Sequence, residues 1–175
     1  MIDSEILKRL REGDIRAFEH VVNTYQHEML CVAARIIGQL ADAEEVRQRI
    51  LIRIWQAPQK MPSAEFFEAW LRRCLVNESI SYIRQQKRRD LLTSEFVDSR
   101  ISTSTDEGDF DIEQIRLSLS QLAPEERALL ALKFDQQLTV REIGQVLERS
   151  HTTIQSQLER AIAKLRSLMQ TAVRK

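Results

Sequence analysis

The chain has 175 residues, of which 43% are hydrophobic and 30% charged, which is typical of a globular protein with one ordinary domain or two small ones. Its 26 basic residues balance 26 acidic ones, so the net charge gives no sign of a nucleic-acid partner. Only four Gly and three Pro are present, and this scarcity of turn signals favours an all-α fold.

Apolar residues at helical spacing predict four helices in the first 90 residues. The predicted helices cover residues 3–11, 14–38, 42–57 and 63–83, and the last of them is followed by a basic cluster. Gly38 suits the position after a helix end, and the Asp-x-x-Glu pattern at the start of the third helix resembles a capping box. The three long helices can share one core, which predicts a helical domain over residues 1–90.

The helical periodicity fades over residues 91–111, which are rich in Ser, Thr, Asp and Glu. This composition predicts a flexible acidic linker between two small helical domains. A second domain then covers residues 112–175. In it, Pro124 opens a helix whose apolar face is supplied by Leu129, Leu130 and Phe134.

A pair of capping signals predicts a helix-turn-helix in the second domain. Thr139-Val-Arg-Glu142 is a capping-box pattern that opens a short helix, and Ser150 can cap a longer one with apolar residues on one side. The polar face of the longer helix carries short donors and acceptors that suit base edges in a major groove, while nearby cations suit phosphates. The candidate DNA-binding residues are Arg149, Ser150, His151, Thr152, Thr153, Gln155, Ser156, Gln157, Arg160 and Lys164. Helix pairs in bundles look alike, so plain helix packing remains an alternative at this point.

Two stretches carry a family resemblance that spans nearly the whole chain. Residues 122–165 read LAPEERALLALKFDQQLTVREIGQVLERSHTTIQSQLERAIAKL, which resembles the helix-turn-helix region 4 of sigma-70 family factors. Residues 17–89 contain AFEHVVNTY, DAEEVRQRILIRIW and FFEAWLRRCLVNESISYIRQQKRR, which resemble region 2 of the extracytoplasmic-function (ECF) group. The order and spacing of the two stretches agree with this group.

The resemblance implies a transcription initiation factor that binds core RNA polymerase and directs it to promoter DNA. Region 2 would engage and melt the −10 element, region 4 would read the −35 element, and the turn over residues 57–65 matches a loop that captures an extruded base. The residues matching the helix that binds the polymerase beta-prime clamp helices are Asp42, Glu45, Gln48, Arg53 and Trp55. The candidates for the −10 region are Lys60, Ser63, Arg73, Asn77, Arg84, Lys87 and Arg88.

The chain also departs from the pattern of the family. Arg49 stands where relatives usually carry an acidic residue, and Arg47 occupies a commonly apolar place. In the recognition helix, Gln155 and Gln157 replace common basic residues, and Glu148 takes a turn position often held by Gly. These departures predict altered contacts to polymerase or DNA.

Other patterns point away from enzyme or metal chemistry. His27 and Cys31 lie four residues apart on a predicted helix, but no second pair completes four zinc ligands. No phosphate-binding loop or nucleophile elbow occurs, so we expect no enzyme activity, no cofactor and no metal. Trp70 has the spacing of a core residue rather than of a DNA platform. With neither a leader nor a membrane span in the sequence, we expect a cytoplasmic protein without membrane insertion.

Two other functions remain open from the sequence alone. One is a stand-alone helix-turn-helix regulator that dimerises through its N-terminal helices, and the other is a sigma-derived adaptor that binds proteins instead of promoter DNA. Sigma factors of the ECF group are often held inactive by an anti-sigma factor, so the resemblance also admits such a partner.

Overall fold

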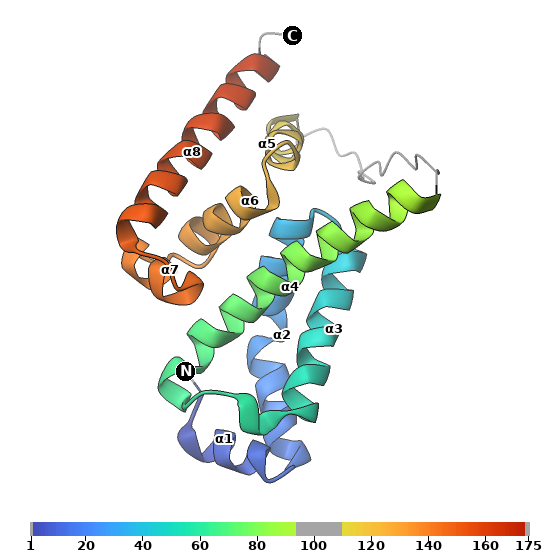
Figure 1. The fold of residues 1–175 in the computed structure, drawn as a ribbon, viewed down its shortest axis with the longest axis vertical. Coiled ribbons are helices and arrows are strands. Elements are labelled where there is room, and N and C mark those ends of the chain that lie inside the picture. Colours follow the sequence, from blue (N-terminus) through green and yellow to red (C-terminus); the bar gives the residue numbers. More distant parts are fainter. Residues whose placement is uncertain (1, 94–109, 174–175) are drawn as a thin grey trace.

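The computed structural model describes residues 2–93 and 110–173, which form helices joined by turns and short connections and contain no strand (Figure 1). The N-terminal unit, residues 2–93, contains α1 (Ser4–Arg11), α2 (Ile15–Ile37), α3 (Leu40–Gln56), the 3-10 turn η1 (Pro58–Lys60) and α4 (Ala64–Thr93). The C-terminal unit, residues 110–173, contains α5 (Phe110–Ser120), α6 (Pro124–Leu130), the π-helical turn η2 (Ala131–Asp135), α7 (Val140–Leu147) and α8 (His151–Val173). None of these helices is both long enough and apolar enough to cross a membrane.

Local capping explains the ends of the first two helices. Asp3 accepts a hydrogen bond from the amide of Glu5 at 3.0 Å, and Asp14 accepts one from the amide of Arg16 at 2.8 Å. Helix α2 ends at Gly38, whose φ of 95° lies in the left-handed region that glycine adopts without strain. The predicted helix over 14–38 is therefore confirmed.

Helix α3 begins at Leu40, before the predicted start at Asp42, so the capping-box prediction is wrong there. The residue that precedes the helix, Gln39, makes no side-chain capping bond. The carboxylate of Asp42 instead accepts a hydrogen bond from the hydroxyl of Tyr82 on α4, at 2.8 Å. A contact between two helices has thus taken the side chain that local capping would have used.

The core of the N-terminal unit lies between α2, α3 and α4, which pack against one another. Each helix contributes large side chains that are almost completely buried, among them Met29, Ile36, Ile50, Ile54, Phe67, Leu71 and Leu75. Burial of each such side chain stabilises the fold by about 1.5–3 kcal/mol. Trp70 is partly buried, with its ring centroid 5.7 Å from that of Phe67, in agreement with a packing role.

The helix-turn-helix of the C-terminal unit forms as predicted. Thr139 and Glu142 cap α7 reciprocally, and Ser150 Oγ accepts a hydrogen bond from the amide of Thr153 at the start of α8. Gly144 lies where the turn approaches α7 closely, because a Cβ there would be 2.8 Å from the carbonyl oxygen of Arg149. Leu132, Ile143, Ile154 and Ala161 are among the residues that form the core of this unit.

Two predictions for this half of the chain are corrected. Phe134 was expected on an apolar face, but it is 59% exposed. The π-helical turn η2 places Leu132 in the core, so the side chain of Phe134 points to solvent. Helix α4 extends to Thr93 and α5 begins at Phe110, so both ends of the predicted linker over 91–111 are helical. The remainder of that linker, residues 94–109, lies outside the described residues.

The two units lie against each other. Helix α6 and η2 contact α2, and α7 contacts the N-terminal half of α4, which runs diagonally across the molecule in Figure 1. Buried residues of both units belong to one hydrophobic cluster. This packing brings the turn of the helix-turn-helix next to α4.

Candidate functional site

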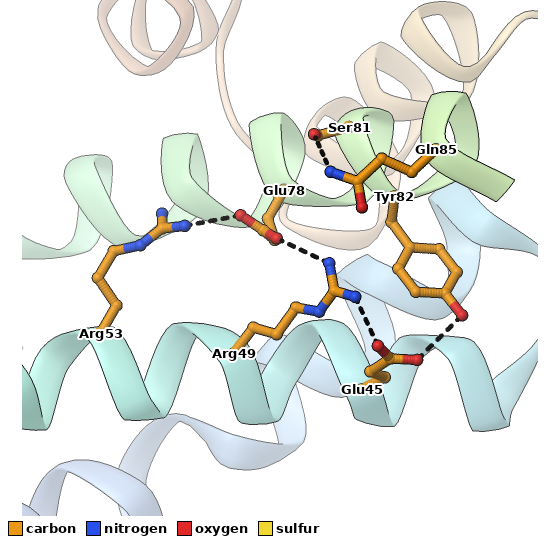
Figure 2. Close-up of polar contacts among 7 residues, drawn as sticks. All are labelled: Glu45, Arg49, Arg53, Glu78, Ser81, Tyr82 and Gln85. Atoms are coloured by element: carbon orange, nitrogen blue, oxygen red, sulfur yellow. Dashed lines mark hydrogen bonds and ion pairs between the residues drawn. The ribbon is translucent and has the colours of Figure 1, made fainter. Parts of the chain in front are cut away.

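A network of charged side chains joins α3 to α4 (Figure 2). Glu78 of α4 is largely withdrawn from solvent, with 14% of its side chain exposed. It accepts hydrogen bonds from two guanidinium groups of α3, from Arg53 at 2.7 Å and from Arg49 at 3.4 Å. Because a half-buried carboxylate needs such partners, the two arginines hold α3 in a fixed register against α4.

Tyr82 and Arg49 organise the other end of the network. The hydroxyl of Tyr82 lies 2.8 Å from a carboxylate oxygen of Asp42 and 3.1 Å from one of Glu45, so its single proton is shared between the two. Burial together with these carboxylates raises the pKa of Tyr82. Arg49 donates to Glu45 at 2.6 Å and lies 5.2 Å from the ring centroid of Tyr82. The hydrogen bond from Arg49 is the main reason why the pKa of Glu45 is lowered. The unusual Arg49 therefore has an internal role, and three of the residues predicted to bind polymerase (Asp42, Glu45 and Arg53) also belong to this network.

The outer face of α3 carries the other two predicted polymerase contacts. Gln48 and Trp55 are exposed there, and Ile52 lies between them with 53% of its surface exposed. The ring of Trp55 is 40% exposed and packs 5.1 Å from that of Phe18 on α2. Sequence reasoning missed Ile52, although its spacing from Gln48 and Trp55 places it on the same stripe of the helix. We call Gln48, Ile52 and Trp55 the outer α3 stripe.

Three of the candidates for the −10 region share one side of α4, and two of these contact the C-terminal unit. Arg73 forms an ion pair with Glu148, and Arg84 forms one with Glu125 at 2.9 Å. Asn77 lies between them and lines a cavity of about 130 Å³ with residues of both units. The face proposed for DNA is thus partly occupied by acidic side chains of the C-terminal unit.

The remaining −10 candidates lie at the two ends of α4. Lys60 and Ser63 are exposed in the segment that precedes the helix, and Lys87 and Arg88 are exposed near its far end. The structure therefore spreads the predicted set along the whole helix instead of gathering it into one cluster. This distribution suits an extended single strand more than a compact ligand.

Helix α8 presents the predicted recognition residues on an open face. His151, Thr152, Thr153, Gln155 and Arg160 are exposed, while Ser156 and Gln157 are half-buried. The apolar residues of the same turns, Ile154, Leu158 and Ala161, face the core. This division between a buried and a polar face is that of a helix that can enter a major groove.

Ion pairs and hydrogen bonds modify this set. Lys164 contacts Glu126 of α6 at 2.7 Å, which ties it to its own unit. Burial alone would raise the pKa of Glu126, but hydrogen bonds from Lys164 and from the amide of Ala123 outweigh it and lower the pKa. Glu159, which sequence reasoning missed, accepts a hydrogen bond from Gln155 on the exposed face.

His27 and Cys31, the pair considered as metal ligands, have no further ligand beside them among the described residues. Cys31 Sγ and His27 Nε2 are 3.6 Å apart on α2, and no group of three or more His, Cys, Asp or Glu side chains occurs among the described residues. Both residues line a cavity of about 1110 Å³ between α2 and the C-terminal unit. At the edge of this cavity, Arg35 forms an ion pair with Asp135 at 3.1 Å.

Comparison with known families decides the family of the chain. The model of Sigma-70 region 2 matches residues 21–89, and the model of Sigma-70, region 4 matches residues 118–167. The chain belongs to the sigma-70 family. The first match covers most of α2 and all of α3 and η1, together with α4 as far as residue 89, and the second covers α6, η2, α7 and most of α8. The predicted resemblance is therefore confirmed in both units.

Relatives assign this sigma factor to the ECF group. The chain is 26% identical to the RNA polymerase sigma-E factor of Streptomyces antibioticus over 93% of its own length and 89% of the relative. It is 24% identical to the ECF RNA polymerase sigma factor SigW of Bacillus subtilis, over 95% and 96% of the two chains. The protein is thus a promoter-directing transcription initiation factor.

Solved structures share its fold. CnrH, in complex with the cytosolic domain of CnrY, is 21% identical and superposes with a TM-score of 0.70 over 97% of each chain. RpoE of Bartonella quintana, in complex with the anti-sigma factor NepR, is 20% identical with a TM-score of 0.73, over 89% of this chain and 98% of RpoE. At these identities the likeness supports the all-helical, two-unit fold.

Proposed function

We propose that this sigma factor binds core polymerase mainly through the outer α3 stripe. The exposed Ile52, with Gln48 and Trp55 on either side, carries this proposal. Large apolar side chains exposed in a row on one helix are suited to a helical partner, such as the clamp helices of the beta-prime subunit. Asp42, Glu45 and Arg53 support the stripe from the network that fixes α3 to α4.

The two units then act on different parts of the promoter. Residues 1–90 form the domain that engages and melts the −10 element through α4 and the loop before it, since exposed cations along this helix suit a melted strand. Residues 112–175 form the domain that reads the −35 element through α8. The segment between them connects the two domains.

The partners follow from these roles. Core RNA polymerase and promoter DNA are the principal ones, and catalysis belongs to the polymerase rather than to this chain, which acts in the cytoplasm. CnrH and RpoE are both described in complexes, the latter with an anti-sigma factor. An anti-sigma factor is therefore a candidate partner here as well.

The outer stripe is tested by Ile52→Ala and Trp55→Ala. Each substitution is expected to weaken binding of full-length protein to core polymerase by about tenfold or more, since anchors in such interfaces contribute about 1–2 kcal/mol or more. Fluorescence titration of labelled protein with core measures the affinity. Phe134→Ala is the control, because Phe134 is also a large exposed apolar residue but lies in the C-terminal unit. If both α3 variants bind core as the wild type does, the stripe is not the docking surface.

A further inference from the structure

The amide of Gln155 on α8 has its orientation fixed by a neighbour. Gln155 Nε2 donates to Glu159 Oε1 at 2.5 Å, one turn along the helix, and both side chains are exposed. An ionised carboxylate accepts hydrogen bonds but donates none, so the nitrogen of the amide must face it. The carbonyl oxygen of Gln155 then lies on the opposite side of the amide from Glu159, on a side chain that is exposed to solvent.

Gln157 on the same helix has the opposite arrangement. Its Oε1 accepts from Arg149 Nη1 at 3.2 Å. A guanidinium only donates, so here the oxygen is held and the amide nitrogen is turned outward. Two glutamines of one recognition helix therefore present opposite hydrogen-bonding groups, each set by a charged neighbour.

We propose that Glu159 is a positioning residue for base recognition, which holds the Gln155 amide with its oxygen outward so that Gln155 selects adenine or cytosine. This inference rests on the proposed reading of the −35 element by α8. In the major groove only adenine and cytosine present an exocyclic amino donor, whereas guanine and thymine present carbonyl acceptors at the corresponding edges.

The role of Glu159 is to prevent the amide from turning over. A free glutamine can present either its oxygen or its nitrogen, so it tolerates donors and acceptors alike. With the amide held, guanine O6 or thymine O4 would face a carbonyl oxygen and both acceptors would lose their partner. We therefore expect Gln155 to favour adenine or cytosine over guanine or thymine by about tenfold or more in affinity. This is within the discrimination that one good base contact provides.

Selection from a promoter pool tests this proposal. Full-length protein and core polymerase are incubated with templates whose upstream segment is randomised, and the bound DNA is sequenced. Gln155→Ala identifies the position that Gln155 reads, since the base preference should relax there. Glu159→Ala should relax the same position by about tenfold, because the amide can then turn.

Glu159→Lys gives the sharpest result. A lysine donates only, so it should hold the oxygen of Gln155, turn the nitrogen outward and invert the preference to guanine or thymine. Ala163→Lys is the control for a nearby lysine: it places the same side chain one turn further along the exposed face, and it changes the net charge by half as much as Glu159→Lys. The control should raise affinity on all templates alike and leave the base preference unchanged.

Each outcome decides the matter. Inversion by Glu159→Lys at the position that Gln155→Ala relaxes supports the proposal. An unchanged preference in Glu159→Lys, or no relaxed position in Gln155→Ala while other upstream positions stay selected, overturns it and leaves the reading by α8 intact. If the wild type selects no upstream sequence at all, the proposed role of α8 fails and the inference fails with it.

Discussion

Helix α4 of the N-terminal unit and α8 of the C-terminal unit both present polar groups suited to DNA, but their surroundings differ. On α4, Arg73 and Arg84 are paired with Glu148 and Glu125 of the other unit. On α8, Gln155 bonds to Glu159 and Lys164 to Glu126, and both contacts lie within the C-terminal unit. The compact arrangement thus leaves one reading face open and covers part of the other.

The contacts between the units are of a kind that can open. Arg84 and Glu125 have 73% and 43% of their side chains exposed, and exposed ion pairs contribute about 0–1 kcal/mol each. Some apolar contact adds to them, since both units share one hydrophobic cluster. On the proposed role of α4, DNA would compete with the C-terminal unit for Arg73 and Arg84. Salt should favour opening of the contact between the units, because it screens these exposed ion pairs.

The largest expected effect is a substitution that lowers the stability of the C-terminal unit and leaves that of the N-terminal unit unchanged. Gly144→Val should destabilise the C-terminal unit by about 3 kcal/mol, because the new side chain meets the carbonyl oxygen of Arg149. Both tryptophans, Trp55 and Trp70, lie in the N-terminal unit, so their fluorescence reports that unit alone. We expect thermal unfolding by circular dichroism to begin at lower temperature while the tryptophan transition stays in place.

The matched control for this prediction is Gly13→Ala. Gly13 has a φ of 84° but open space around it, so this substitution should cost only about 1 kcal/mol of backbone strain, in the N-terminal unit. If Gly144→Val shifts both transitions together, the two units fold as one and the comparison above is wrong.

A smaller effect concerns the contact between the units. Glu148→Gly removes the ion pair with Arg73, and it also removes the strain of a non-glycine residue at φ 53°. The free protein should then bind a single-stranded oligonucleotide several-fold more tightly at low salt, because Arg73 is released. Fluorescence anisotropy with a labelled strand measures this change.

Glu148→Gln separates the two consequences of that substitution. It removes the charge but keeps the side chain at the left-handed position, so it should raise DNA affinity like Glu148→Gly without the gain of about 1 kcal/mol in stability. Unchanged DNA affinity in both variants would show that Arg73 is not held back by the C-terminal unit.

The parts of the fold that sequence predicted correctly are those set by local chemistry. Asp14 and Gly38 mark the start and the end of α2 through contacts with neighbouring residues. Thr139 and Glu142 cap the start of α7 in the same local way. The start of α3 was predicted wrongly because Asp42 bonds to Tyr82, a residue far along the chain. Such contacts are set by packing and leave no local pattern.

In the candidate site, too, local features could be predicted from the sequence and features set by packing could not. The polar face of α8 could be predicted from helical spacing alone. The same spacing also predicts that Ile52 is exposed, because it lies one turn after Gln48 on the outer α3 stripe. The internal role of Arg49 could not, because its partner Glu78 lies on another helix. The ion pair of Arg73 with Glu148 depends on how the two units pack, which no spacing in the sequence reveals.

The smallest expected effect is a pH-dependent one in the C-terminal unit. The pKa of Glu142 is lowered, chiefly by its hydrogen bonds with Thr139, from an ordinary value of 4.5. A lowered pKa in the folded state means that the ionised carboxylate stabilises the fold above that ordinary value, and that this contribution is lost as pH falls through the lowered pKa. Glu142→Gln should therefore lower the melting temperature of the dichroism transition by no more than a few degrees near neutral pH, and the difference from wild type should vanish in acid. The tryptophan transition should be the same in both proteins at every pH. A difference that persists in acid would mean that Glu142 stabilises α7 through packing and not through its charge.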